Sequence, residues 1–279
     1  MVIALLFGAA FLGTILYLTQ FNQQVFGANA TTSGLMLMPM ILGLSITAAL
    51  SGQLVTKTGK YKAIIMSGFT IATFGVFALT ILGPQSPYWH EAVIMVFVGI
   101  GLGSGMSIMN LAVQNEFEQK DLGAATASNQ LFRGLGTTIG TALLGTILTT
   151  GVAAGIGSLN NDAYVQALRR QPAAVAILGT GDVSASTALN LNTSVVQKSI
   201  NEGIDKGTAK LPTPVRQQVK ADFTKKQDAF HEKIVNSFSD SLHSIFIVSG
   251  VLMALATIGT IFIVEKPLHG GHDDTPGIV

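Results

Sequence analysis

The chain contains no cysteine and carries little charge. Only 11% of its 279 residues are charged, against about 25% in an ordinary soluble domain. The lack of cysteine excludes disulfides, thiolate metal sites and a cysteine nucleophile. The scarcity of charge, together with 48% hydrophobic residues and a mean hydropathy of +0.51, indicates an integral membrane protein.

Further absences narrow the function. The net charge is +1 and no basic stripe alternates with aromatic residues, so we expect no nucleic-acid partner. There is no His-Glu-x-x-His, no Gly-x-Ser-x-Gly and no pair of aspartates within an apolar stretch, which argues against an intramembrane enzyme. The N-terminus lacks the basic residues of a signal peptide. The histidines and aspartates between His269 and Asp274 suit a weak metal site, but the glycines beside them favour a flexible tail, so we expect no metal and no cofactor.

Six apolar stretches are long enough to cross a bilayer as helices. They are Val2–Thr19, Ser33–Leu50, Ala63–Leu82, Ala92–Leu111, Ala124–Thr150 and Leu242–Val264. We therefore predict an all-α integral membrane fold, a bundle of six transmembrane helices with one long extracytoplasmic loop. The predicted division of the chain has four segments. Residues 1–150 form five transmembrane helices, residues 151–241 form the loop, residues 242–264 form the sixth helix, and residues 265–279 form a cytoplasmic tail.

The short connections predict the orientation, because long loops translocate largely regardless of charge. The connections after the first and third spans contain no lysine or arginine. The connection after the second span contains three lysines, and single lysines follow the fourth and sixth spans (Lys57, Lys60, Lys62, Lys120 and Lys266). Both termini are therefore predicted to be cytoplasmic, in a multi-pass protein of the cell membrane. Counting the ten basic residues of the long loop would favour the opposite orientation.

The long loop is predicted to be partly helical. Apolar residues recur at helical spacing between Val215 and Leu242, with polar residues between them, and Pro212 and Pro214 mark the start. This helix is expected to run into the sixth span. The stretch from Gly179 to Asn192, rich in small and polar residues, is expected to be loosely ordered.

Small residues predict where the spans pack closely. Three pairs of glycines stand four residues apart, Gly99/Gly103 and Gly101/Gly105 in the fourth span and Gly136/Gly140 in the fifth. No strand precedes the Gly-x-Gly run, so it does not indicate a nucleotide site. Pro39 is expected to kink the second span.

Arg133 is the only charged residue between Gly123 and Thr150. A charge within a span costs about 2.5–3.5 kcal/mol on insertion scales and marks a functional site by default. Snorkelling to the headgroups or a structural hydrogen bond is an equal alternative.

Three segments carry a family resemblance. Gly52–Lys62 resembles the Gly-x-Leu-x-Asp-x-x-Gly-Arg-Arg loop of the major facilitator superfamily, with Thr56 in place of the acid. Ala112–Gly140, which contains Arg133, and Ser239–Phe246 with the ending Glu265–Leu268 look like the last two spans of the fourteen-span drug–proton antiporters (EmrB/QacA type). Leu16–Gln20 and Ser33–Pro39 fit the ninth and tenth spans.

This resemblance implies the C-terminal six-helix half of a secondary active transporter, expected to perform proton-coupled multidrug efflux. The implied partners are a lipophilic or cationic small molecule, the proton, membrane lipid, and an N-terminal half or a second copy of the chain. We expect a fragment that lacks the N-terminal bundle; a native half-transporter is the alternative. A membrane-anchored binding or sensory protein, with the loop 151–241 as its working part, is the competing function.

The resemblance also implies site residues. Substrate contacts are expected from the first span, at Phe11, Tyr17 and Gln20, and from the fourth, at Met106 and Asn110. Ordinary helix packing is the alternative for each of them. Conformational or gating roles are expected at Gly52, Gly59, Lys60, Lys62 and Arg133.

Proton coupling requires a carboxyl group within the membrane. No predicted span contains one, since Glu91 lies at the outer edge of the fourth, and the coupling acids are therefore assigned to the other half. His243 is expected to be an interfacial hydrogen-bond donor.

Overall fold

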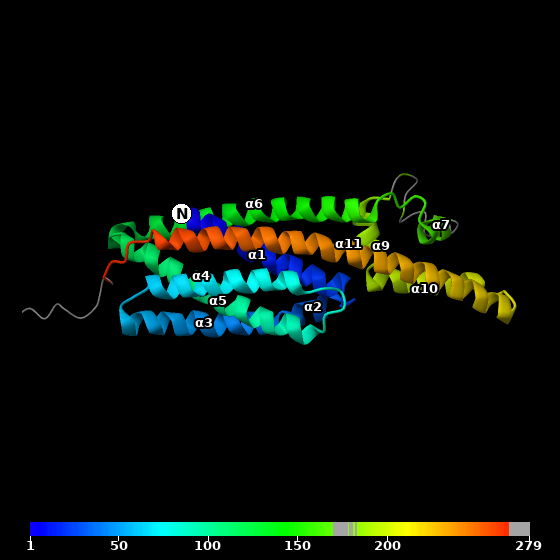
Figure 1. Ribbon diagram of the computed structural model, residues 1–279, viewed down its shortest axis with the longest axis horizontal. Helices are drawn as coiled ribbons and strands as arrows, with labels where there is room; N and C mark the ends of the chain where they lie inside the picture. Colours follow the sequence, from blue (N-terminus) through cyan, green and yellow to red (C-terminus); the bar gives the residue numbers. More distant parts are fainter. Residues whose placement is uncertain (170–177, 179–180, 182, 268–279) are drawn as a thin grey trace, which may run out of the picture. The chain divides into compact units, whose positions relative to one another are not determined.

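The computed structural model describes residues 1–169, 178, 181 and 183–267 (Figure 1). The predicted tail from Leu268 onward, with its histidines and aspartates, lies outside the described residues, as do 179, 180 and 182 of the stretch expected to be loosely ordered. Within the described part all regular structure is helical. The helices are α1 (Val2–Gln24), α2 (Ala30–Met36), α3 (Met38–Thr58), α4 (Lys62–Ala78), α5 (Tyr88–Glu116), α6 (Leu122–Ile156), α7 (Ala163–Arg169), α9 (Ala185–Leu191), α10 (Ser194–Thr208) and α11 (Thr213–Ile261).

Six of these helices, α1, α3, α4, α5, α6 and α11, are long and apolar enough to cross a membrane. A 3-10 turn (Leu79–Ile81) extends α4, and another (Gln119–Asp121) precedes α6. The predicted fold class, a bundle of six membrane helices, is confirmed.

The residues group into two compact units. The bundle unit comprises residues 1–16, 36–144 and those from 246 onward, and the loop unit comprises residues 17–35 and 145–245. Helices α1, α6 and α11 contribute residues to both units. Each unit is described by itself below.

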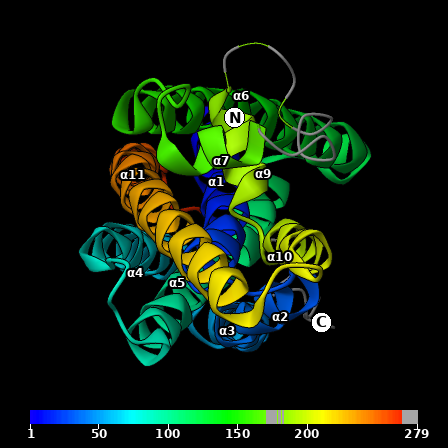
Figure 2. The same ribbon diagram turned by 90° about the vertical axis from the view of Figure 1, so that its right-hand side faces the viewer.

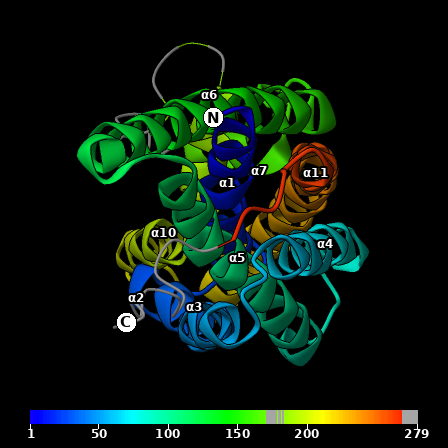
Figure 3. The same ribbon diagram turned by 90° about the vertical axis from the view of Figure 1, so that its left-hand side faces the viewer.

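Within the bundle unit, α5 packs against both α3 and α4 (Figures 2 and 3). The glycines of α5 explain how one helix serves two neighbours. A Cβ at Gly99 or Gly103 would collide with the backbone of α3, while one at Gly101 would collide with the backbone of α4 and one at Gly105 with Phe69 of α4. Positions two residues apart lie about 200° apart around a helix, so the two interleaved pairs occupy opposite faces.

Glycines also join α1 to α6. Gly136 and Gly140 lie against the backbone of α1 at Leu5 and Ala9, and Gly8 of α1 lies against the Arg133 carbonyl of α6. The Thr137 hydroxyl donates a hydrogen bond of 3.2 Å to the Gly8 carbonyl across this contact. The predicted close packing at Gly136 and Gly140 is confirmed.

The start of the second span differs from the prediction. A turn at Leu37 separates α2 from α3, and Pro39 lies in the first turn of α3 rather than in the middle of a helix. Proline fits there because the first amides of a helix have no partner within it. Pro39 therefore begins a helix instead of kinking one.

The loop unit has a core of its own. The Tyr164 ring contacts the rings of Phe223 and Phe230 of α11, at centroid distances of 5.4 and 5.0 Å. The Gln227 side-chain amide donates to the Tyr164 hydroxyl at 3.3 Å. Burial raises the pKa of Tyr164 to about 12, and the bond from Gln227 opposes part of that rise.

Helix α11 is continuous over 49 residues and contains the whole predicted apolar series. Phe223, Phe230 and the later members are buried, whereas Val215 and Val219 are exposed. The stretch expected to be loosely ordered contains α9, which the Ser184 side chain caps by accepting the Thr187 amide at 3.2 Å.

The α1–α6 contact generates a stability prediction. Gly136→Ala places a methyl group where the Leu5 carbonyl lies, so we expect the free energy of unfolding to fall by about 1–3 kcal/mol, as for other overpacked sites. Gly134→Ala is the matched control, because nothing lies within 4 Å of a Cβ at Gly134. Denaturant unfolding in micelles measures both variants. Equal free energies of unfolding for the two variants would contradict the close contact of Gly136 with Leu5.

Candidate functional site

A pocket of about 400 Å³ lies within the bundle unit. Its walls come from α1, α4, α5, α6 and the chain that follows α11, and they are mostly apolar (Ile3, Ala4, Ile65, Met109, Ala112, Val113, Phe117, Ile263 and Val264). Tyr61, Glu116 and Asn129 are its polar side chains. The size and the small number of polar groups are those of a pocket for a small, largely apolar molecule.

Asn129 links two walls of this pocket. Asn129 is 1% exposed, and its side-chain amide donates to the side-chain oxygen (Oδ1) of Asn110 at 2.7 Å, joining α6 to α5. A hydrogen bond between membrane helices contributes about 0.6–2 kcal/mol. Asn110, predicted to contact substrate, is thus engaged with Asn129 and does not line the pocket.

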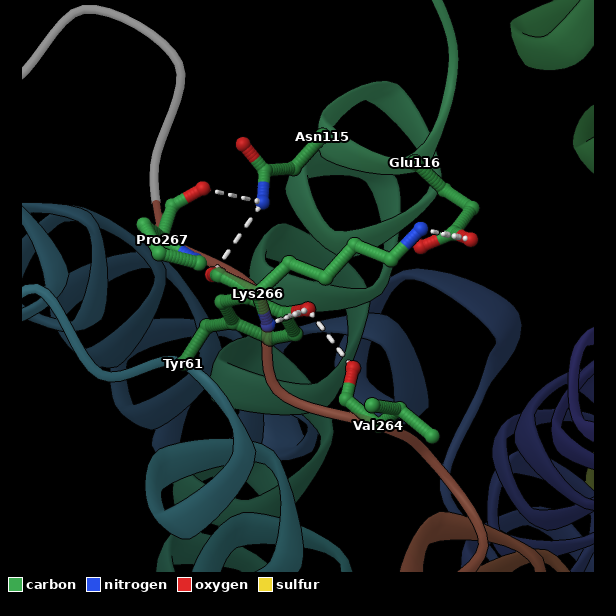
Figure 4. Close-up of polar contacts among 6 residues, drawn as sticks. All are labelled: Tyr61, Asn115, Glu116, Val264, Lys266 and Pro267. Carbon is green, nitrogen blue, oxygen red and sulfur yellow. Dashed lines mark hydrogen bonds and ion pairs between the residues drawn. The ribbon is translucent and has the colours of Figure 1, made fainter.

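Tyr61 and Glu116 of the pocket wall also belong to a set of polar contacts that we call the C-terminal clasp. Tyr61, Lys62, Asn115, Glu116 and Lys266 make it with the chain from Ile261 to Pro267. Figure 4 shows the part of the clasp around Tyr61, Asn115 and Lys266. The buried Tyr61 hydroxyl donates to the Val264 carbonyl and accepts the Lys266 amide, both at 3.1 Å. These bonds serve backbone groups beyond the end of α11 that have no helical partner.

Two further residues of α5 complete the clasp. The Asn115 amide donates to the carbonyls of Lys266 and Pro267, at 3.4 and 3.2 Å. Lys266 forms an ion pair with Glu116, as Figure 4 shows. Both members of this pair are about half exposed, so it adds little stability beyond the backbone bonds.

The connection between α3 and α4, with Lys57, Lys60 and Lys62, is called the lysine loop below and contributes to the same clasp. The Lys62 ammonium donates to the Ile261 carbonyl at 2.7 Å, and its backbone amide donates to a Glu265 carboxylate oxygen at 3.3 Å. Gly59 ends α3 at φ +68°, in the left-handed region, and makes the reversal that brings Tyr61 and Lys62 to this position. Lys60 is exposed, and Gly52 has no atom within 4 Å of a Cβ built on it.

Arg133 is half-buried at the α1–α6 contact. Its guanidinium donates to the Gln130 side-chain oxygen, one turn earlier in α6. Glu116 and Glu118, at the connection between α5 and α6, are paired with Lys266 and Lys120. Within the described part of the chain no carboxylate pairs with Arg133.

The other predicted substrate residues are not brought together at this pocket. The Phe11 ring stacks on Phe7 at 5.5 Å, and Phe7 stacks on Phe69 of α4 at 5.3 Å. Met106 is half-buried in α5 and does not line the pocket. Tyr17, Gln20 and the half-buried His243 belong to the loop unit.

Glu91 is a functional candidate that the sequence analysis assigned to the edge of a span. Helix α5 begins at Tyr88, earlier than predicted, so Glu91 lies in its first turn, and its side chain is 0% exposed. Pro87, in an extended conformation, starts the helix, and the Tyr88 hydroxyl anchors it by donating to the Met36 carbonyl at 2.8 Å. The bundle therefore contains a fully buried carboxyl group.

The sequence profile of the Major Facilitator Superfamily matches residues 1–141, just over half of the chain. The chain belongs to the Major Facilitator Superfamily. The Multidrug transporter protein MdtP of Bacillus subtilis is 30% identical over 260 residues, which cover 92% of this chain and 43% of that protein. The Tetracycline resistance determinant of Streptomyces rimosus is 24% identical over 265 residues, covering 92% of this chain and 69% of its own length.

A third relative, Multidrug resistance protein 3 of Bacillus subtilis, is 30% identical over 149 residues, 53% of this chain and 29% of that protein. The chain thus spans less than half of the length of MdtP. As a member of this superfamily with six helices long and apolar enough to cross a membrane, it is a multi-pass membrane protein.

The clasp generates a prediction for hydrogen exchange. Tyr61→Phe removes the acceptor of the Lys266 amide, so we expect that amide to exchange about two- to twelvefold faster, the factor for one hydrogen bond of about 0.5–1.5 kcal/mol. Tyr88→Phe is the control, because its hydroxyl bonds Met36 instead. Mass spectrometry of the exchanged peptide 262–267 measures the rate, and an unchanged rate would rule out the clasp.

Proposed function

We propose that this chain forms one six-helix bundle of a proton-coupled multidrug exporter of the fourteen-span EmrB/QacA type, with both termini cytoplasmic and residues 151–241 outside. The superfamily match carries the proposal. The relatives named as multidrug and tetracycline resistance proteins, and the predominantly apolar pocket, support the class of substrate. The substrate we propose is a lipophilic or cationic small molecule.

The bundle is proposed to work with a second bundle, on a longer chain or as a separate copy. Transporters of this kind alternate access by rocking one bundle against another around a central site. The coverage of MdtP, 43% of its length, fits one bundle of two. The roles that the family resemblance implies remain part of the proposal. Substrate contacts are proposed at Phe11, Tyr17, Gln20, Met106 and Asn110. Conformational or gating roles are proposed at Gly52, Gly59, Lys60, Lys62 and Arg133.

The function is tested by expressing this chain in an efflux-deficient strain, alone and with the N-terminal half of MdtP. We expect export of ethidium, a lipophilic cation, when both bundles are present. Export by the chain alone would indicate that two copies assemble. Absence of export in both cases, with the chain present in the membrane, would contradict the proposal.

The pocket has its own test in the active combination. Val113→Trp fills a wall of the pocket, and we expect about a tenfold loss of apparent ethidium affinity, which corresponds to about 1.4 kcal/mol. Val93→Trp is the matched control, because Val93 lies in the same helix, is 48% exposed and does not line the pocket. If the two variants have the same apparent affinity for ethidium, the pocket does not bind the transported substrate.

Glu91 is the proposed site of the coupling proton in this bundle. Its side chain is fully buried in the first turn of α5, so a group that can exchange a proton lies inside the bundle. Glu91→Gln imitates the protonated form and should reduce uphill export to background while ethidium binding persists. Glu118→Gln, at an exposed carboxylate, should leave export intact. Uphill export by Glu91→Gln would exclude this role.

The binding or sensory alternative rests on one observation, the aromatic core of the loop unit around Tyr164. A ligand that raises the melting temperature of the chain without being exported, and whose effect is lost in Tyr164→Ala, would favour it.

A further inference from the structure

A second cavity of the bundle unit lies apart from the pocket described above and shares no residue with it. It is a groove of about 360 Å³ between α3 and α4, with Ile100 and Ser104 of α5 at its base. Leu50, Leu54 and Ile71, on its sides, are 56%, 48% and 36% exposed. Apolar side chains this exposed on membrane helices are positioned to meet lipid chains.

The hydroxyl groups that line the groove do not need a polar ligand as a hydrogen-bond acceptor. Thr47 and Ser51 donate to carbonyls of α3 at 2.7 and 3.0 Å. Ser67 and Ser104 likewise donate to carbonyls of their own helices, both at 3.0 Å. Because each hydroxyl already has an acceptor within its helix, an apolar body can occupy the groove without leaving a donor unsatisfied.

Charge is confined to one end of the groove. Lys57 lies in the last turn of α3, is exposed, and lines the groove together with Gln53. In the part of the chain that the structure describes, no carboxylate pairs with Lys57. The groove therefore combines an apolar channel with a single cation at its mouth.

The length of the groove matches one leaflet. From Thr47 to Lys57 the lining of α3 spans eleven residues, a rise of about 15 Å along the helix. Half of a hydrocarbon core about 30 Å thick has the same depth. An acyl chain that starts at the headgroup level of Lys57 would end near the bilayer midplane.

We propose that this groove binds one acyl chain of an anionic phospholipid, whose headgroup phosphate lies against the Lys57 ammonium. The apolar walls hold the chain, and the charge at the mouth selects anionic over zwitterionic lipids. This site is independent of the proposed transport function and of the orientation of the protein.

Native mass spectrometry of the full chain, released from micelles that contain phosphatidylglycerol or phosphatidylcholine with identical acyl chains, tests the charge. Lys57→Gln should weaken retention of phosphatidylglycerol about fivefold, the factor for the roughly 1 kcal/mol that one lysine contributes near an anionic surface. Retention of phosphatidylcholine should not change. Lys120→Gln is the control, since Lys120 is exposed and paired with Glu118.

A second variant tests the groove itself. Ser67→Phe places a ring in the groove from an exposed position and should lower the retention of both lipids about tenfold, whereas Ser45→Phe, exposed on α3 outside the lining, should lower neither. The proposal is overturned if Lys57→Gln and Lys120→Gln retain the same amount of phosphatidylglycerol, or if the two phenylalanine variants retain the same amount of lipid. It is also overturned if no lipid is retained because another bundle covers the groove.

Discussion

Contact between helix backbones at glycine holds the bundle unit together. Lipid chains are as apolar as leucine, so burial of apolar side chains gives membrane helices little reason to associate, and close packing has to supply the attraction. Helix α5 meets α3 with one face and α4 with the other because glycines occupy both faces. Helix α6 meets α1 in the same way at Gly136 and Gly140. The pocket walls and the Asn110–Asn129 bond depend on these spacings.

Hydrogen bonds between polar groups add to the glycine contacts of the bundle unit. An amide pair joins α5 to α6, and the clasp binds the chain beyond α11 to α5 and to the lysine loop. In apolar surroundings an unsatisfied polar group is costly, so these hydrogen bonds favour one packing of the helices over packings in which the bonds are broken. The hydroxyl of Tyr61, with two backbone partners, makes two of these bonds.

The sequence was sufficient for the number and type of spans, since long apolar stretches have few alternatives to membrane helices. It also located the glycine pairs through which α5 and α6 pack against their neighbours. It did not place the start of α5, because Pro87 and the polar residues after it read as a loop, and it did not predict that Glu91, in the first turn of α5, is buried. The clasp was not predicted, because it joins Tyr61 to residues about 200 positions later, mostly through backbone atoms. Asn129 was a polar residue in an apolar span, which is a signal that could have found it.

The clasp has a consequence for how its C-terminal segment tolerates change. Tyr61 and Asn115 bind only carbonyl and amide groups of residues 261–267, whereas the side chains of Glu265 and Lys266 make the two contacts of this segment that depend on residue type. Every amino acid supplies the same carbonyl, so the chemical identity of the other residues is weakly constrained. Their spacing is strongly constrained, because one inserted or deleted residue would move every acceptor away from its donor. Among homologous chains this segment should therefore vary in composition, except at Glu265 and Lys266, while its length stays fixed.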